Sequence, residues 1–160
     1  MPHSIHEILN ELHIPFQEFP HEPVFTVEQA KAVYQNIPGG RCKNILLRDK
    51  KGNRHFLVIM PADKELDPSK IREKFSTSKL GGAQEYEVEK YLGVKPGAVS
   101  PFALINDLER HVEVLVDEDL FKEAEVHFHP NVNTASLLIK TEDLKKFLDG
   151  TGAKWQIIAL

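Results

Sequence analysis

The amino-acid sequence predicts one α+β domain spanning residues 1–160, with a mixed, mainly antiparallel sheet and flanking helices. The first observation is a clear hairpin, in which apolar segments 41–49 and 54–61 are joined by a polar turn that contains Gly52. The second is the order of elements, with strands paired in hairpins, helices between them, and no internal repeat or linker. The third is the length of 160 residues, which suits a single domain with its own core.

In the first half of the chain, helix starts are marked by capping residues. Ser4 and Thr26 are each followed three residues later by Glu or Gln, a pattern that predicts one helix stopped by Pro15 and a second ending near 37–40. Segment 16–19 alternates between them as a short strand. After the hairpin, Asp67 followed by Pro68 predicts the start of a basic helix.

The second half predicts two more helices and the remaining strands. Segment 84–92 has a helical pattern that Gly93 ends, and Thr141 is expected to cap the last helix. Alternating or apolar segments predict strands at 111–117, 126–128, 135–140 and 155–160.

Segment 93–107 combines two glycines and two prolines ahead of an apolar run. We expect Gly93 to adopt the left-handed conformation of a helix C-cap, and Gly97 to leave room for another group to approach the backbone. Pro101 stands just inside the apolar run, which we expect to be a strand at an edge or a pocket rim.

Composition narrows the possible function. The sequence is 41% hydrophobic and 28% charged, and it contains no apolar run long enough to cross a bilayer. The single cysteine, Cys42, cannot form an internal disulfide, and the N-terminal residues carry no export signal, so we expect a cytoplasmic protein. The net charge of −4 repels phosphate weakly, so an RNA partner would have to be held by a local basic patch.

Lys43 is the most unusual residue of the hairpin. Strand alternation places its ammonium on the same face as Ile45 and Leu47, whereas Asn44 points to the other face. A lysine near a strand end can simply extend to water. Alternatively, the cation lines a pocket and binds a phosphate or a developing negative charge.

Segment 129–136 is a second polar cluster, which begins with His129 before a proline. His127 and His129 can share a strand face, but no third ligand stands at a recognisable spacing, so we expect no metal and no cofactor. His129 can equally be a structural residue in a turn. No Gly-x-Ser-x-Gly elbow, phosphate loop or dinucleotide motif is present, and Ser100 has no evident base as a partner.

Five motifs, in this order, resemble the YbaK/ProX-type aminoacyl-tRNA editing family, which is similar to the editing domain of bacterial prolyl-tRNA synthetases. The resemblance covers nearly the whole chain. Its Gly-Ala-Val-Ser-Pro-Phe form looks like the branch that deacylates Ala-tRNA(Pro), and the Gly-Gly-Cys-Ser-Pro form of the branch acting on Cys-tRNA(Pro) is absent. The motifs are Phe25–Ala30, Lys43-Asn44, Leu57–Lys64, Gly97–Phe102 and His129–Thr134.

The resemblance implies hydrolysis of an aminoacyl ester without a metal or a covalent intermediate. By this resemblance Lys43 would anchor the 3′ end of the tRNA, Asn44 would support the site, and the loop 97–101 would offer backbone groups to the carbonyl or the attacking water. His129 would shape and polarise the aminoacyl pocket. The substrate-binding residues would also include Ser100, Pro101, Ile45 and Phe102, with Leu47 and Val99 as further candidates for an aliphatic pocket floor.

The implied partner is mischarged tRNA(Pro), with Ala-tRNA(Pro) as the leading substrate, and prolyl-tRNA synthetase is a candidate protein partner; neither DNA nor a membrane is expected. Two alternatives stay open: a catalytically silent module that binds a tRNA 3′ end or a small ligand, and a deacylase for Ser- or Cys-tRNA(Pro). For the tRNA stem, the best basic patch comprises Lys70, Arg72, Lys74 and Lys79, and a second comprises Arg48, Lys50, Lys51 and Arg54. Either patch can also be an ordinary solvated surface.

Overall fold

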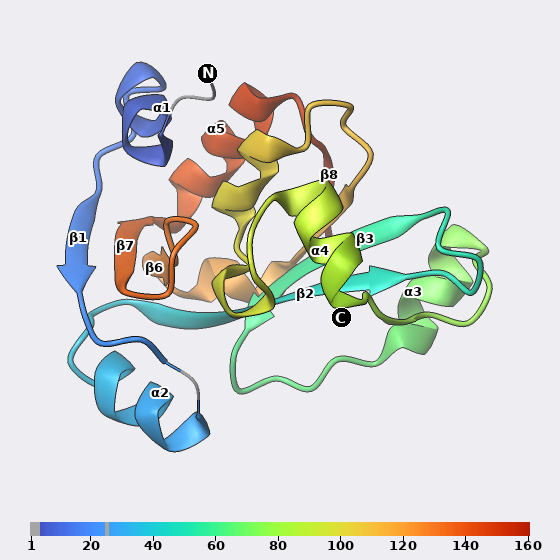
Figure 1. Cartoon of the computed structure of the whole chain (residues 1–160), viewed down its shortest axis with the longest axis horizontal. Helices are drawn as coiled ribbons and strands as arrows, with labels where there is room; N and C mark the ends of the chain where they lie inside the picture. Colours follow the sequence, from blue (N-terminus) through green and yellow to red (C-terminus); the bar gives the residue numbers. More distant parts are fainter. Residues whose placement is uncertain (1–3, 25) are drawn as a thin grey trace.

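The computed structural model describes residues 4–24 and 26–160, so Phe25 of the first motif lies outside the described residues. The predicted α+β fold is confirmed (Figure 1). Its α-helices are α1 (Ile5–Glu11), α2 (Val27–Tyr34), α3 (Pro68–Phe75), α4 (Glu85–Leu92) and α5 (Thr141–Thr151). Its strands are β1 (Gln17–Pro20), β2 (Gly40–Arg48), β3 (His55–Pro61), β4 (Gly81–Gly82), β5 (Glu113–Asp117), β6 (Glu125–Phe128), β7 (Ala135–Lys140) and β8 (Lys154–Ile158).

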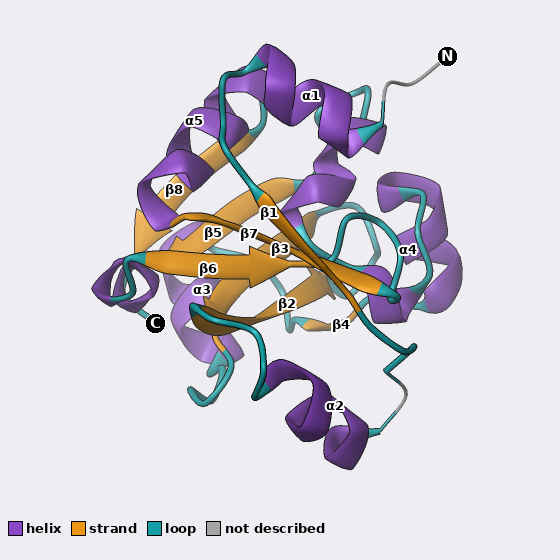
Figure 2. Cartoon of the chain, turned by 90° about the vertical axis from the view of Figure 1, so that its left-hand side faces the viewer, coloured by secondary structure: helices purple, strands orange, loops and turns teal. Residues whose placement is uncertain are grey.

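One mixed sheet runs through the molecule in the order β1-β7-β6-β2-β3-β5-β8, and β4 pairs separately with β2 (Figure 2). The pairs β1–β7, β2–β3, β2–β4 and β6–β7 are antiparallel. The pairs β2–β6, β3–β5 and β5–β8 are parallel. The prediction of a mixed sheet with mainly antiparallel pairing is therefore correct, and the predicted hairpin is β2–β3.

The sheet separates two apolar cores. The main core contains Leu46, Leu57 and Ile59 from one face of the hairpin, together with residues of α1, α4 and α5. The second core contains Leu47 and Val58 from the other face, packed with Ile71 of α3 and the end of the chain. Because β3 is covered on both faces, its residues from His55 to Met60 are all buried, as the uniformly apolar pattern predicts.

Helix starts follow the predicted signals closely. Ser4 accepts a hydrogen bond from the backbone N–H of Glu7, and Thr26 forms a complete capping box with Gln29. Asp67 caps α3, whose first residue is Pro68. Within the described residues, no helix is long and apolar enough to span a membrane.

Three expectations about local structure are wrong. α2 ends at Tyr34 rather than near 37–40, because residues 35–37 form a turn. Thr141 is the first residue of α5 and not its cap, since its hydroxyl donates to the Glu123 carbonyl oxygen at 2.6 Å. The segment after Ser100 is not a strand, because Pro101–Asn106 forms a 3₁₀ helix.

The 3₁₀ helix after Ser100 has a clear local cause. The Ser100 hydroxyl accepts from the Phe102 backbone N–H at 3.1 Å, which caps the helix, and Pro101 occupies its first turn. Phe102 then enters the main core, where its ring meets Phe128 and Phe147 edge-to-face. The apolar run is therefore buried on a helical turn instead of a strand.

We predict that Phe102→Ala lowers the free energy of unfolding by about 3–5 kcal/mol, because it leaves a cavity at a fully buried position. Urea unfolding followed by circular dichroism measures this. Leu108→Ala is the control: Leu108 is 78% exposed, and its truncation should change stability by less than about 0.5 kcal/mol. Equal effects of the two substitutions would contradict the placement of Phe102.

Candidate active site

The sheet opens along one edge of β2. On this edge Gly40 and Arg41 pair with β6, whereas Leu47 and Arg48 pair with β4. Among the described residues, no strand pairs with segment 42–46 on this edge, although the Leu46 carbonyl accepts from Ala83 N–H. Lys43, Asn44 and Ile45 therefore lie where β2 changes its partner.

The parallel register of β2 and β6 relates Lys43 to His129. Gly40 is opposite Val126 and Arg41 is opposite His127. Continued by two residues, this register places Lys43 level with His129, at the point where the two strands diverge. Residues that are far apart in the sequence thus lie just beyond the last paired residues of β2 and β6.

The two faces of β2 divide the predicted residues. Ile45 packs against the second core, so alternation places Lys43 on that side, and its half-buried ammonium has no ion pair or hydrogen bond with any described residue. Asn44 lies on the main-core side with Leu46. Its side-chain oxygen is buried without a hydrogen-bond partner in the described part of the chain.

Ser100 connects the glycine loop, residues 97–101, to His129 at the end of β6 by a hydrogen bond. Its hydroxyl donates to the His129 carbonyl oxygen at 2.8 Å while accepting from Phe102 N–H, and the residue is fully buried. Both hydrogen-bonding functions of the hydroxyl are thus used inside the protein. Ser100 is therefore a structural clasp in this conformation rather than a free nucleophile.

The His129 ring is held at both nitrogens. Nδ1 lies 3.1 Å from the Ala135 carbonyl oxygen, which can only accept, so Nδ1 carries the proton. Nε2 therefore accepts from the Tyr34 hydroxyl at 2.8 Å. Burial lowers the pKa of His129, partly opposed by the bond to Ala135, so the ring is neutral near pH 7.

A cavity of about 620 Å³ lies beside this clasp. A Cβ on Gly97 would meet nothing within 4 Å, which agrees with the prediction that this glycine leaves its side of the backbone open. The cavity is of the size and mixed lining typical of small-ligand sites. Its lining residues are Val24, Lys95, Gly97, Ala98, Asn131, Val132, Asn133 and Thr134.

The structure thus brings together some of the predicted residues and separates others. Gly97 and the 131–134 turn share the cavity, and Ser100 joins the loop to His129. Pro101 and Phe102 are buried beneath the loop. The basic residues of α3 and Lys79 line none of this cavity, and a separate cavity of about 310 Å³ beside Arg41, Asp63 and Glu123 contains none of the predicted site residues.

Two residues at the site escaped the sequence analysis. Tyr34 is the last residue of α2 and supports His129 through its hydroxyl, while the Arg41 guanidinium lies 4.9 Å from the Tyr34 ring centre. Lys95 lines the cavity and pairs with Glu89 at 2.6 Å. Nothing in the local sequence of Tyr34 indicates a partner 95 residues away.

The described side chains around this opening favour water as the nucleophile. Ser100 is engaged, and the only cysteine of the chain, Cys42, is mostly buried, with its pKa raised to about 12 by burial and by Glu123. A thiol with so high a pKa is not an active nucleophile near pH 7. The free Lys43 ammonium and open backbone groups suit the binding of an anion or the polarisation of a carbonyl.

The chain is an α+β domain whose sheet opens beside the Gly97 loop, and comparison with known proteins identifies its family. The aminoacyl-tRNA editing domain model matches residues 21–147, so the chain belongs to this family. The prolyl-tRNA editing protein ProX of Acetoanaerobium sticklandii is 36% identical over 95% of this chain and 93% of that protein. The resemblance inferred from the five motifs is thereby confirmed.

Two more distant matches agree with this assignment. The multifunctional Ser/Thr-tRNA deacylase ProXp-y of Escherichia coli is 25% identical over 85% of this chain and 81% of that protein. The crystal structure of a hypothetical protein has a TM-score of 0.75 at 22% identity, covering 96% of this chain and 97% of that chain. The latter match establishes the fold alone.

We predict that the histidines behind this opening make stability depend on pH. The pKa of His127 is lowered to about 4, mainly by burial and also by His129, Arg41 and His21. In the unfolded chain His127 is protonated below about pH 6.5, whereas in the folded chain it stays neutral down to about pH 4. The free energy of unfolding therefore falls as the pH decreases from about 6.5 toward 4, and this residue contributes up to about 3 kcal/mol to the decrease. Urea unfolding at several pH values measures it.

His127→Phe should flatten this pH dependence, whereas His13→Asn, a change at an exposed histidine with positive φ, should leave it intact. An unchanged slope in His127→Phe would contradict a neutral, buried His127.

Proposed function

We propose that this member of the aminoacyl-tRNA editing family is a trans-editing deacylase that hydrolyses the ester of mischarged tRNA(Pro), with Ala-tRNA(Pro) as its leading substrate. One observation supports the proposal: two family motifs, Gly97–Phe102 and His129–Thr134, line one cavity and are joined by Ser100, while a third, Lys43-Asn44, lies on the stretch of β2 that has no strand partner on that edge among the described residues. The identity to ProX over almost the whole chain supports the choice of tRNA(Pro).

The proposed mechanism relies on positioning rather than on a strong base. Lys43 binds the phosphate of the terminal nucleotides and anchors the 3′ end, since its ammonium is free. Backbone groups of the loop at Gly97 hold the carbonyl oxygen, each such donor being worth roughly 10²–10³ in rate. A bound water then attacks the ester, which is already activated and needs no covalent intermediate.

Asn44 and His129 complete the proposed site in different ways. The buried, unpartnered oxygen of Asn44 is the kind of polar group expected where a ligand or water completes a hydrogen bond. His129, neutral and held at both nitrogens, shapes the pocket and does not transfer a proton in this arrangement.

Recognition energetics explain why such an enzyme is needed. A synthetase pocket built for proline rejects alanine weakly, because each missing methylene changes binding by only about 1–3 kcal/mol. A second pocket that admits alanine and excludes the proline ring corrects the error. Val24, Ala98 and Val132 supply apolar surface for such a pocket.

We predict that the wild type hydrolyses Ala-tRNA(Pro) in EDTA, spares Pro-tRNA(Pro), and loses at least about 10²-fold in kcat/KM on Lys43→Ala, because the anchor of the 3′ end is removed. Single-turnover hydrolysis of radiolabelled esters measures this. Lys154→Ala, at an exposed lysine on edge strand β8, should be neutral.

Other outcomes select other functions. Preferential hydrolysis of seryl or threonyl esters would favour the specificity that the name of the E. coli relative carries. Preferential hydrolysis of cysteinyl esters would indicate that Cys-tRNA(Pro) is the substrate. Binding of tRNA without any hydrolysis would contradict the deacylase and support a silent binding module, in which the engaged Ser100 and His129 are purely structural.

The proposed tRNA surface combines α3 with the turn of the hairpin. Lys70, Arg72 and Lys74 are exposed on α3, and Lys79 lines a cavity of about 340 Å³ together with Arg48 and Lys50. Arg54 is the weakest candidate, because its guanidinium forms two hydrogen bonds with Glu113 at 2.9–3.0 Å.

We predict that Lys79→Ala weakens tRNA binding and reduces the slope of log Kd against log salt concentration by about 0.7–0.9, the value for one lost phosphate contact. Filter binding of uncharged tRNA(Pro) at four salt concentrations measures the slope. Arg54→Ala and Lys154→Ala should leave it unchanged; a slope that responds to Lys154 and not to Lys79 would place the tRNA on a different face.

A further inference from the structure

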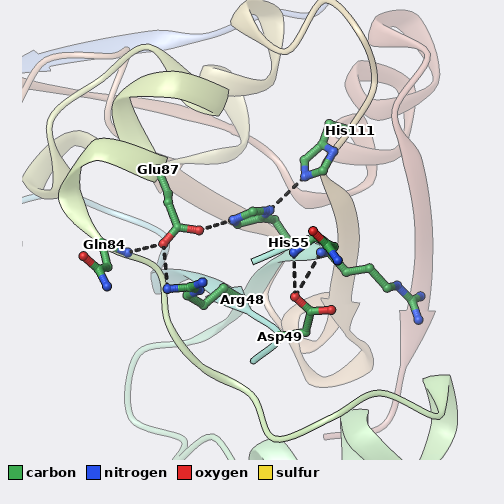
Figure 3. Close-up of polar contacts among 8 residues, drawn as sticks. Arg48, Asp49, His55, Gln84, Glu87 and His111 are labelled. Carbon is green, nitrogen blue, oxygen red and sulfur yellow. Dashed lines mark hydrogen bonds and ion pairs between the residues drawn. The ribbon is translucent and has the colours of Figure 1, made fainter. Parts of the chain in front are cut away.

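A buried ionic cluster lies at the far end of the hairpin, outside the cavity described above (Figure 3). His55 of β3 is completely buried and Glu87 of α4 is 3% exposed. Nε2 of His55 is hydrogen-bonded to a carboxylate oxygen of Glu87, and Nδ1 of His55 lies 2.8 Å from Nε2 of His111. Residues from a strand, a helix and a loop thus form one hydrogen-bonded chain.

Both oxygens of the Glu87 carboxylate are occupied. Oε2 faces His55, whereas Oε1 accepts from the Gln84 backbone N–H at 3.1 Å and lies 3.5 Å from the Arg48 guanidinium. A carboxylate can accept from all of these donors only in its ionised form. Burial alone would raise the pKa of Glu87, but these donors and the Arg48 charge together lower it.

The protons in the chain follow from the ionised carboxylate. His55 donates Nε2–H to Glu87, and one proton lies between Nδ1 of His55 and Nε2 of His111. The Tyr91 ring stacks on the His111 ring with centroids 4.2 Å apart, which attaches a second residue of α4 to the chain. The other titratable or charged groups around it are Arg48, Asp49, Lys90, Asp107 and Glu109.

α4 connects this cluster to the cavity wall. The helix ends at Gly93, and the Asn106 side chain donates to the Leu92 carbonyl oxygen at 2.9 Å. The next residues form the loop of Gly97, in which Ala98 N–H donates to the Lys95 carbonyl at 2.9 Å. Val94 and Ala98 are buried in the main core, which also contains Val88 and Leu92 of α4, so the loop and the helix pack against the same core.

We propose that Glu87 is a positioning residue for the proposed deacylation: its hydrogen-bonded chain through His55 to His111 fixes α4 against the hairpin and thereby holds the Gly97 wall of the cavity in place. The expected effect on ester hydrolysis rests on the proposed function. The expected effect on the position of α4 and the Gly97 loop does not. In this proposal the hydrogen bonds, and not the packing of the rings, hold α4 in position. Ring packing alone does not fix the direction of the Glu87 carboxylate.

Three substitutions separate hydrogen bonding from packing. Glu87→Gln keeps the shape but turns an NH₂ group toward one of the donors, because an amide has a single acceptor oxygen. His111→Phe keeps the ring on Tyr91 and removes the hydrogen bond to His55, whereas His111→Gln removes the ring and can keep a hydrogen-bonding group at the position of Nε2. Glu85→Gln, on the exposed face of α4, is the control for the change of charge.

Amide hydrogen exchange of Ala98 and Val99 is the first readout, measured where every variant is folded. Glu87→Gln and His111→Phe should accelerate this exchange by about tenfold relative to the wild type, while His111→Gln and Glu85→Gln should not. The kcat of ester hydrolysis should fall by about tenfold to hundredfold in the same two variants, with KM for the tRNA unchanged.

Each outcome decides the inference. If His111→Phe matches the wild type and His111→Gln does not, packing holds α4 and the proposal is wrong. If Glu87→Gln fails to fold, the two His111 variants still give the answer. If the wild type cleaves no aminoacyl ester, the proposed function fails, and the exchange data alone decide whether Glu87 positions the loop.

Discussion

The change of strand partner along β2 is the constraint on which the rest of the site depends. One edge of β2 is paired with β3 from Cys42 to Arg48, which fixes the strand rigidly, while the other edge passes from β6 to β4. The unpaired N–H and C=O groups of a strand need other partners, which another segment, a side chain, water or a ligand can supply. In this fold the stretch without a strand partner on that edge carries Lys43 and Asn44, the second of the five family motifs.

The segments around this opening are held together by hydrogen bonds between side chains and distant parts of the chain. Ser100 joins the glycine loop to the end of β6, and Tyr34 joins α2 to His129. Glu87 and His55 join α4 to the hairpin at the other end of the same strands. Buried polar bonds of this kind contribute modest net stability, but leaving one unsatisfied is expensive, so they select one arrangement of the loops. The cavity thus has walls set by specific hydrogen bonds as well as by the apolar core.

The sequence predicts those features that local signals determine. The hairpin, the caps at Thr26 and Asp67, and the left-handed Gly93 all follow from short patterns, and the structure has each of them. The 3₁₀ helix at 101–106 was missed because its cap, Ser100, also serves a distant carbonyl at His129. Tyr34 and the Glu87 chain could not be found, because their partners lie 32 to 95 residues away. The relation between Lys43 and His129 likewise requires the parallel register of β2 and β6.

The central claim, that the ligand enters the opening between β2, the Gly97 loop and the 129–134 turn, is tested most directly by NMR. The measurement is a ¹H–¹⁵N titration of the protein with a non-hydrolysable 3′-alanylamino-adenosine, in which an amide replaces the ester. The backbone amides of Lys43, Asn44, Gly97 and the turn 131–134 are expected to shift, while those of β8 are not. Shifts confined to the cavity beside Arg41 and Glu123 would contradict it.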